Sequence, residues 1–329
     1  MILKKTHHLK STLKLNFDLF SLDSNIQAKS PNSWLWCEFD CQKLKEVYLK
    51  RLRTENQNKI GLVLSKRSDC GYSTAVKYLI KLRSSQQKCG LPIVFLNHLC
   101  DYLNPELKNN VNASFTNLFF TNRLSKPIKA VHQLSEKFAE LLGAFAADGY
   151  FHKHKSDYYI KITEGNEHTI EVLSKKIEHL FDFSSRITFA DNAWTLWIKN
   201  KAICRYFEHI FNFRPGKKAD IVHMPEIIKR TDFLIQRAFV RGVFTFDGCV
   251  KTNGNVSFCT KSQHLLEDVK KVLDEDTIDY KIMFNKNKEA WILESSSGRN
   301  KELLQKWEIY FFEDTIKHQK IEFFLGRLK

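Results

Sequence analysis

A nine-residue segment occurs twice in this chain, and the two copies lie 99 residues apart. In each copy an apolar run ends in Asp-Gly, at Asp148-Gly149 and again at Asp247-Gly248. Small residues recur at spacings of four and three, which places them on one face of a helix. A stripe of this kind lets two helices approach more closely than the usual separation of about 8–10 Å. We therefore expect the two copies to pair as helices through Ala139, Gly143 and Ala146 in the first and Ala238, Gly242 and Thr245 in the second.

The acidic residue that ends each copy is unfavourable in a lone helix. Asp148 and Asp247 would lie in the last turn, where an acid opposes the helix dipole at a cost of about 0.3–1 kcal/mol. On paired helices the two carboxylates would meet at one end, where a cation or a shared proton would relieve their repulsion. The alternative is that each aspartate serves only the turn between helix and strand. The duplication favours the paired site.

The segments Leu141–Gly149 and Val240–Gly248 resemble the signature of the LAGLIDADG homing endonucleases, in the two-motif, single-chain form. The resemblance covers roughly the last 200 residues. It departs from the family at the sixth position, which is often acidic there and is Ala146 and Thr245 here.

The resemblance implies a Mg²⁺-dependent DNA endonuclease that uses one aspartate per DNA strand and makes staggered cuts. Asp148 and Asp247, with the backbone of Ala147 and Phe246, would hold two or three divalent ions, and Mn²⁺ could substitute. In the two-metal scheme such ions activate a water and stabilise the leaving oxygen. It also implies a catalytic basic residue at Lys199, whose counterpart is Ser296, and water-orienting positions at Glu164 and Thr260.

The pattern of elements repeats in the two halves, residues 131–226 and 227–329. Each half reads α-β-β-α-β-β-α, with alternation in strands and a strong hairpin turn at Asn253-Gly254. We expect an α/β protein of the α+β type, in which two pseudo-symmetric repeats form a saddle-shaped antiparallel sheet with helices on one face.

The chain carries 52 Lys and Arg against 37 Asp and Glu, a net charge of +15 that indicates a polyanionic partner. One face of the expected sheet is polar and basic, as a duplex-binding surface requires. A solvated sheet face is the alternative for any single residue. The candidate DNA-binding residues on this face and in its loops are Tyr159, Lys161, Thr163, Ser257, Lys261, Lys281, Lys286, Lys288 and Arg299.

The N-terminal region divides into three parts. We expect a polar basic arm over residues 1–30, a mainly helical domain over 31–103 and a linker over 104–130, which is rich in asparagine and contains Pro105 and Pro127. Within the domain, a helix, a glycine-containing turn and a basic helix resemble a helix-turn-helix DNA-binding unit. An ordinary helical domain remains the alternative.

The eight cysteines include one close pair, Cys37 and Cys41, which could supply half a zinc site. No second pair follows nearby, so we expect buried thiols in a reducing compartment. The first ten residues lack the apolar stretch of a secretory signal, and no run is long enough for a membrane span. We expect an intracellular protein of the cytoplasm or nucleoid, or of an organelle in a eukaryotic host.

Double-stranded DNA is the expected partner of a monomer with an internal pseudo-twofold axis. A non-cleaving DNA-binding regulator on the same scaffold is the main alternative, and an intron RNA maturase is a second one. Some regulators of this fold lack the catalytic acids, whereas both are present here.

Overall fold

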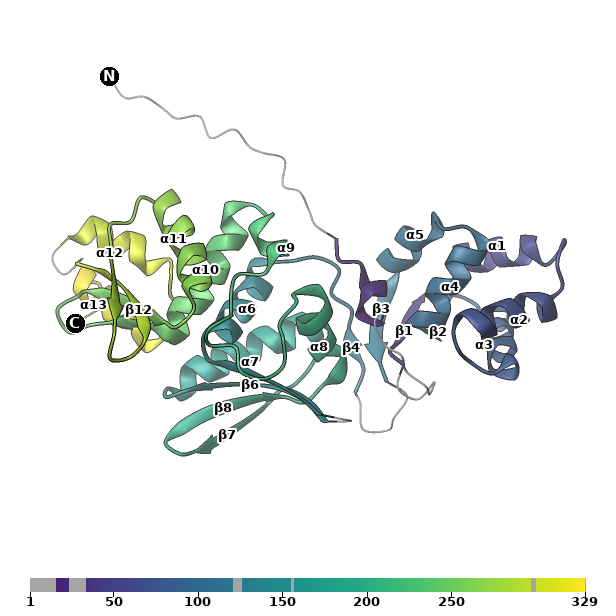
Figure 1. The fold of residues 1–329 in the computed structure, drawn as a ribbon, viewed down its shortest axis with the longest axis horizontal. Coiled ribbons are helices and arrows are strands. Elements are labelled where there is room, and N and C mark those ends of the chain that lie inside the picture. Colours follow the sequence, from purple (N-terminus) through teal and green to yellow (C-terminus); the bar gives the residue numbers. More distant parts are fainter. Residues whose placement is uncertain (1–15, 24–33, 121–125, 155–156, 297–299, 329) are drawn as a thin grey trace, which may run out of the picture.

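The computed structural model of the chain describes residues 16–23, 34–120, 126–154, 157–296 and 300–328. An N-terminal domain is followed by two similar halves, and the first half lies between the N-terminal domain and the second half (Figure 1). Among the described residues, no helix is both long and apolar enough to cross a membrane.

The N-terminal domain combines helices with an antiparallel sheet of order β2-β1-β3-β4. The helical content agrees with the prediction of a mainly helical domain, and local capping marks where helices begin. For example, Asn56 caps α2 by accepting a hydrogen bond from the backbone of Lys59. The elements are β1 Trp36–Asp40, α1 Gln42–Arg51, α2 Gln57–Arg67, α3 Tyr72–Ser84, β2 Lys88–Pro92, α4 Ile93–Leu103, α5 Leu107–Ala113, β3 Phe115–Phe119 and β4 Ile128–Lys129.

The predicted linker over 104–130 is wrong for its described residues, because they contribute α5, β3 and β4 to this domain. β3 pairs with β1 along its length, and Phe115 and Leu118 are buried. The asparagines that suggested a loop have structural partners. Asn112 donates to the carbonyl of Phe17, and Asn117 donates to the carboxylate of Glu38. Apolar alternation was the stronger signal in this segment, and the asparagine content was misleading.

The predicted basic arm over 1–30 is also wrong where the structure describes it. Residues 19–23 form a short 3-10 helix, η1 Leu19–Asp23, in which Leu19 and Leu22 are fully buried. The ring of Phe17 packs against Phe138 and Phe211 of the first half. The apolar residues of this segment therefore join it to the core, and the rest of the predicted arm lies outside the described residues.

The two halves repeat one order of elements, as the sequence predicts. The first half contains α6 Glu136–Asp148, β5 Gly149–His154, β6 Asp157–Glu164, α7 Glu167–Phe181, β7 Arg186–Ala190, β8 Ala193–Ile198, α8 Lys201–Arg205 and a π-helical turn, η3 Tyr206–Ile210. The second contains α10 Phe233–Asp247, β9 Gly248–Val250, β10 Val256–Thr260, α11 Gln263–Glu275, β11 Lys281–Asn285, β12 Ala290–Ser295 and α12 Lys301–Glu308. A short helix, α9 Glu226–Lys229, precedes α10, and a helix missing from the sequence prediction, α13 Ile316–Leu325, follows α12.

Each half contributes one four-stranded antiparallel sheet, of order β5-β6-β8-β7 and β11-β12-β10-β9. The α+β class and the internal repeat are thus confirmed, and the strands form two sheets, one in each half. In β6 the side chains of Ile160 and Ile162 are fully buried, whereas those of Tyr159, Lys161 and Thr163 are partly exposed. The alternation therefore gives each sheet a helix-covered face and an open outer face.

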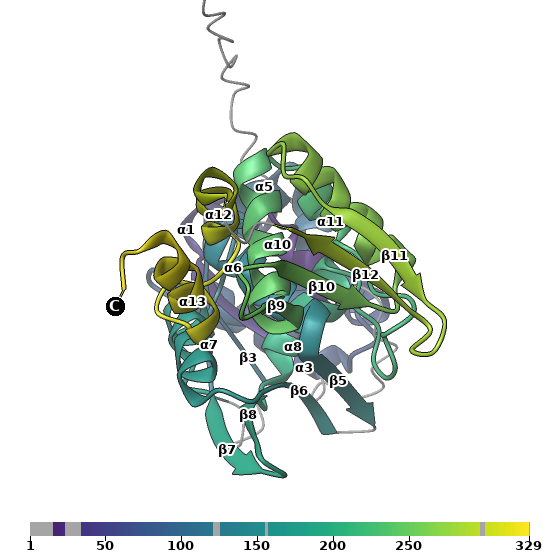
Figure 2. The ribbon, with the colours of Figure 1, turned by 90° about the vertical axis from the view of Figure 1, so that its left-hand side faces the viewer.

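The paired helices α6 and α10 lie side by side at the centre of the two halves (Figures 1 and 2). Ser135 caps α6 and Asp232 caps α10, each through a side-chain oxygen. Glycines allow the backbones to touch. A Cβ at Gly143 would lie 1.9 Å from the carbonyl oxygen of Phe239, and one at Gly242 would lie 2.2 Å from that of Glu140. Only glycine fits at these two crossing points.

Candidate functional site

Asp148 and Asp247 are the last residues of α6 and α10, at equivalent positions of the two halves. Burial removes water from the carboxylate of Asp148 and so raises its pKa. The same effect, together with the negative charge of Asp148, raises the pKa of Asp247 to about 7. The two carboxylates therefore interact electrostatically at one end of the helix pair.

Both aspartates nevertheless keep contact with solvent. Asp148 is exposed to solvent and Asp247 is partly exposed. In the described part of the chain, no basic side chain forms an ion pair with either carboxylate within 4.0 Å. Their negative charge is thus incompletely balanced by the protein itself.

Two lysines that the sequence interpretation missed lie beside the aspartates. Lys218 Nζ donates hydrogen bonds of 2.5 and 2.7 Å to the carbonyl oxygens of Ala146 and Ala147. Lys317 Nζ does the same in the other half, with hydrogen bonds of 2.7 and 2.6 Å to the carbonyl oxygens of Thr245 and Phe246. The last carbonyls of a helix have no partner within the helix, and each lysine supplies one.

The lysines are related by the same 99-residue offset that relates the aspartates. This offset was the available signal. Lys218 lies in an irregular connector and Lys317 is the second residue of α13, where no periodic pattern marks them. Burial lowers the pKa of Lys218 to about 8, against the opposing effect of the Asp247 and Asp148 charges. Burial also lowers the pKa of Lys317, although Glu164 and both aspartates act in the opposite direction.

The two predicted water-orienting positions differ in their surroundings. Glu164, at the end of β6, is partly buried, and burial raises its pKa, which the charge of Lys317 lowers and that of Asp148 raises. Thr260, at the end of β10, is 8% exposed, and its hydroxyl accepts a hydrogen bond from the backbone of Ser262. Glu164 therefore faces the aspartate pair, whereas the hydroxyl of Thr260 already has a local partner.

Lys199, the predicted catalytic basic residue, lies elsewhere, on the outer face of the first sheet. Its Nζ lies 5.2 Å from the ring centre of Trp197 and 5.9 Å from that of Tyr159. The charges that act on Asp148 are those of Lys218 and Lys317. The structure thus brings Lys218 and Lys317, and not Lys199, into the surroundings of the carboxylates.

The candidate DNA-binding residues of the first half share the outer face of its sheet. Lys161 lies 5.3 Å from the ring centre of Tyr150 and 5.8 Å from that of Trp197. Tyr159 stacks on His152, with ring centres 4.6 Å apart, and Thr163 lies within 3.1 Å of the hydroxyl of Thr195. This face therefore presents cations, aromatic rings and hydroxyl groups together.

The candidates of the second half are more dispersed. Ser257 lies on the outer face of β10, and Lys281 is exposed at the start of β11. Lys286 and Lys288 are exposed in the turn between β11 and β12, and Lys261 is exposed after β10. Arg299 lies outside the described residues.

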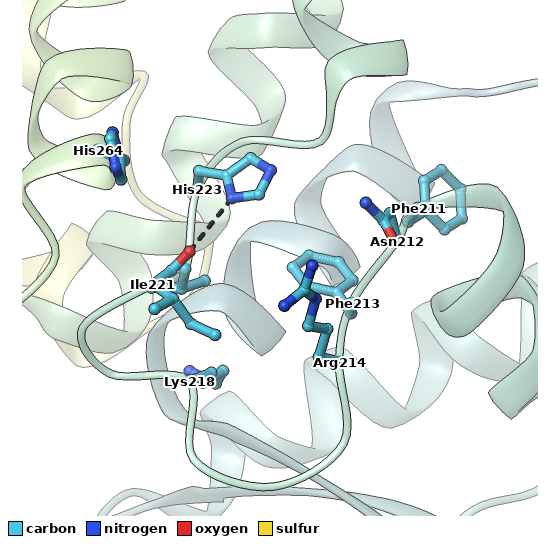
Figure 3. A pocket seen from close by; sticks show the side chains of 9 residues that line it. Phe211, Asn212, Phe213, Arg214, Lys218, Ile221, His223 and His264 are labelled. Atoms are coloured by element: carbon cyan, nitrogen blue, oxygen red, sulfur yellow. Dashed lines mark hydrogen bonds between the residues drawn. The ribbon is translucent and has the colours of Figure 1, made fainter.

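A cavity of about 300 Å³ opens beside Lys218. Figure 3 shows it between His264, at the start of α11, and the connector that follows the first half. Its lining combines the aromatic ring of Phe213 with the basic or titratable side chains of Arg214, Lys218, His223 and His264, and it includes no acidic residue. This surface favours an anionic neighbour.

The cysteines differ in their exposure. Five are buried, as predicted, and they are Cys37, Cys41, Cys89, Cys100 and Cys204. Cys70 is partly exposed, and Cys249 and Cys259 are exposed on the second sheet, contrary to the prediction. Strand alternation places these two on the outer face. The described residues contain no group of three or more His, Cys, Asp or Glu side chains suited to hold a metal ion.

The residues at the end of the helix pair nevertheless fit a hard divalent cation. Asp148 and Asp247 are accessible and mutually repulsive. The carbonyls of Ala147 and Phe246 each accept one hydrogen bond from a lysine and keep a second lone pair for a cation. Mg²⁺ is commonly held by one or two carboxylates and completes its coordination with water and substrate phosphate. These protein oxygens alone would therefore not complete the coordination of the ion, and water and a substrate phosphate would supply the remaining ligands.

Two family models match the two halves. Residues 138–210 match the WhiA LAGLIDADG-like domain, and residues 235–307 match a LAGLIDADG-like domain. A comparison with proteins of curated function found no match.

Several solved structures resemble the chain. I-DmoI in complex with DNA and Mn is 22% identical, with a TM-score of 0.42, over 53% of this chain and 97% of that one. I-WcaI bound to its DNA recognition sequence is 16% identical, with a TM-score of 0.41, over 58% and 87%. Full-length DUF199/WhiA from Thermatoga maritima is 16% identical, with a TM-score of 0.39, over 58% and 60%.

The duplicated signature, the glycine-mediated helix pair and the two matching family models agree on one assignment. Residues 138–210 and 235–307 are two LAGLIDADG-like domains joined in a single chain.

Proposed function

We propose that this protein is a site-specific endonuclease that cuts both strands of double-stranded DNA with the help of divalent cations. The observation that carries the proposal is the duplicated pair of acid and lysine. Asp148 with Lys218 and Asp247 with Lys317 repeat the same arrangement at the ends of two touching helices. A turn-forming role for each aspartate accounts for neither the equivalent lysines nor the raised pKa values.

In this proposal, Asp148 and Asp247 hold Mg²⁺ or Mn²⁺ together with the carbonyls of Ala147 and Phe246 and with DNA phosphates. When bound, such ions lower the pKa of an attacking water and stabilise the charge on the leaving 3′-oxygen. Each aspartate serves the cut in one strand, so that loss of one leaves a nick in the other.

The lysines would stabilise negative charge on the scissile phosphate and partly offset the charge of the aspartates. Each one uses hydrogen bonds to two carbonyls to fix its Nζ at the helix end. An ammonium group fixed in this way stabilises negative charge that develops on a scissile phosphate. Since the pKa of Lys218 is about 8, its charge is maintained only in the acidic to neutral range, unless bound phosphate raises that pKa.

The outer faces of the two sheets would receive the duplex. Two-stranded ribbons fit the major groove, and lysines on phosphates supply affinity that depends on salt. The N-terminal domain offers a second basic surface, because α3 exposes Lys77 and Lys81 one turn apart. We propose that this helix extends the contact with DNA beyond the saddle, and charge reversal at Lys77 should then weaken binding without slowing cleavage of the bound complex.

The rival function is a regulator that binds duplex DNA without cutting it. The match of the first half to the WhiA type of domain favours this alternative. The accessible carboxylates, neither of which forms an ion pair within 4.0 Å among the described residues, favour cleavage, because a binding surface for DNA gains nothing from two negative charges at its centre. Binding of structured intron RNA is a third possibility, for which a basic surface is equally suited.

The deciding experiment uses a randomised library of DNA duplexes with Mg²⁺, the parent chain and the variants Asp148→Asn and Asp247→Asn. We expect double-strand breaks at one recurrent sequence with the parent chain, and nicks or no cleavage with each variant. Sequence-specific binding without breaks, unchanged in both variants, would establish the regulator. Selective binding of structured RNA and not of duplexes would establish the RNA function.

A further inference from the structure

The outer faces of the two sheets can be compared position by position, because the strand register is known in both. Ile162 pairs with Gly149 after the first aspartate, and Phe258 pairs with Gly248 after the second. The next residue of each strand, Thr163 or Cys259, therefore begins the row of outer-face side chains at the level of the helix ends. We call these the inner rows.

The inner row of the first half consists of Thr163, Thr195 and Thr188, which lie opposite one another on β6, β8 and β7. The hydroxyls of Thr163 and Thr195 lie 3.1 Å apart, and Trp197 Nε1 donates a hydrogen bond of 2.8 Å to Thr188. This row offers hydrogen-bonding groups.

The inner row of the second half consists of Cys259, Ile292 and Met283, which lie opposite one another on β10, β12 and β11. Cys259 is exposed, and the side chain of Met283 is 48% exposed. Every hydroxyl of the first row is thus replaced by a thiol, an aliphatic group or a thioether, on a face that is open to solvent.

The next row outward differs in charge. In the first half it contains Lys161 and Arg186 beside Trp197, and no acidic residue faces them in the row. In the second half Lys281 occupies the place of Arg186, but Ser257 replaces Lys161, and Glu294 replaces Trp197 and pairs with Lys251 at 2.6 Å. This row of the second sheet therefore has less net positive charge for phosphates, beside an inner row that is apolar.

We propose that the second sheet recognises its half of the DNA target through the C5-methyl groups of thymine. In the major groove the thymine methyl is the only apolar group that a base edge presents. Cys259, Ile292 and Met283 would contact such methyls, whereas the threonine row recognises hydrogen-bonding edges. This inference rests on the proposed binding of duplex DNA and adds the base composition of one half of the target.

The test begins with duplexes selected for binding to the complete chain. The half of the site against the second sheet is identified by a photo-crosslinking amino acid introduced in place of Lys286, compared with the parent chain irradiated identically. Thymine is then replaced by deoxyuridine, which lacks the methyl, in one half at a time, and the Kd is measured. We expect thymine to be enriched in the second half, and its replacement there to weaken binding by about four-fold per methyl contacted. The same change in the first half should have little effect.

Two matched variants exchange the chemistry of the rows. Ile292→Thr should remove most of the sensitivity to deoxyuridine in the second half, and Thr195→Ile should create it in the first, with the unfolding temperature of each variant measured alongside. If deoxyuridine weakens binding equally in both halves, or in neither, the inference is wrong. Cleavage of the selected duplex would still support the proposed function in that case. Failure to select any duplex would overturn both.

Discussion

Arg241 of the second half donates a hydrogen bond of 2.6 Å to the carboxylate of Glu140 in the first half. Lys176 donates another of 2.6 Å to the same carboxylate, which is 4% exposed. Arg241 also donates to the carbonyl of Ile309, so one side chain links α6, α10 and the end of α12. This buried network fixes the register of the two helices that carry the aspartates.

Glu140→Ala should therefore destabilise the protein by about 2–4 kcal/mol, because it leaves two cations near the helix interface without their shared partner. Denaturant unfolding measures this loss. Glu171→Ala is the matched control, since Glu171 and its partner His168 are both 48% exposed, and we expect a change within about 0.5 kcal/mol. Similar small losses in both variants would show that the network does not stabilise the helix pair.

Gly143→Ala tests the contact between the helices. The added Cβ would lie 1.9 Å from the carbonyl oxygen of Phe239, so the helices must separate. We expect a loss of stability of at least about 2 kcal/mol and a loss of cleavage beyond the effect on stability, because the aspartates move apart. Gly165→Ala is the control, with no atom within 4 Å of its added Cβ. A fully active Gly143→Ala protein would contradict the role of close helix packing.

Much of this architecture follows from local sequence patterns. The bounds of α7 agree with the spacing of Ile170, Leu173 and Ile177, and Ser135 just before α6 is a residue type that favours the helix start it caps. The linker prediction failed because long-range pairing of β3 with β1 outweighs an asparagine-rich composition that locally favours turns. Periodicity identifies elements, but it does not identify the strand to which a segment pairs.

The candidate site was predictable to a smaller extent. The aspartates follow from the duplicated motif, since their spacing and their place at helix ends are local properties. Lys218 and Lys317 reach the site only through the chain connections after the last helices of each half, and no local pattern indicates that contact. Lys199 satisfied the expected spacing along a strand, yet its side chain packs over Trp197.

The stability of the metal-free protein should depend on pH through Asp247. Its pKa in the folded state is about 7, above the ordinary value of 3.8. The folded state thus binds this proton more tightly than the unfolded chain, so the contribution to stability is greatest at low pH and is lost as the pH rises from about 4 to about 7.

Asp247→Asn removes this loss. We expect its free energy of unfolding at pH 8 to exceed that of the parent by about 1–2 kcal/mol, with a smaller gain at pH 5, because solvent screening and the coupling to Asp148 reduce the effect. Millimolar Mg²⁺ should raise the unfolding temperature of the parent at pH 8 more than that of the variant. Identical pH profiles with and without the substitution would contradict the raised pKa.

The two lysines at the helix ends and the lysine on the sheet should affect different steps of the reaction. Lys218→Met and Lys317→Met remove a fixed ammonium group from one half each, and we expect each to slow cleavage of one DNA strand by about 10²–10³-fold. The cognate duplex should then accumulate as nicked product, with opposite strands cut in the two variants. Lys199→Met removes a cation that lies over Trp197 and should weaken binding several-fold while the single-turnover rate at saturating protein stays near that of the parent. Gels that resolve the two DNA strands measure the cleavage rate of all three variants. If the single-turnover rate at saturating protein falls strongly in Lys199→Met and is unchanged in Lys218→Met, Lys199 is the catalytic lysine.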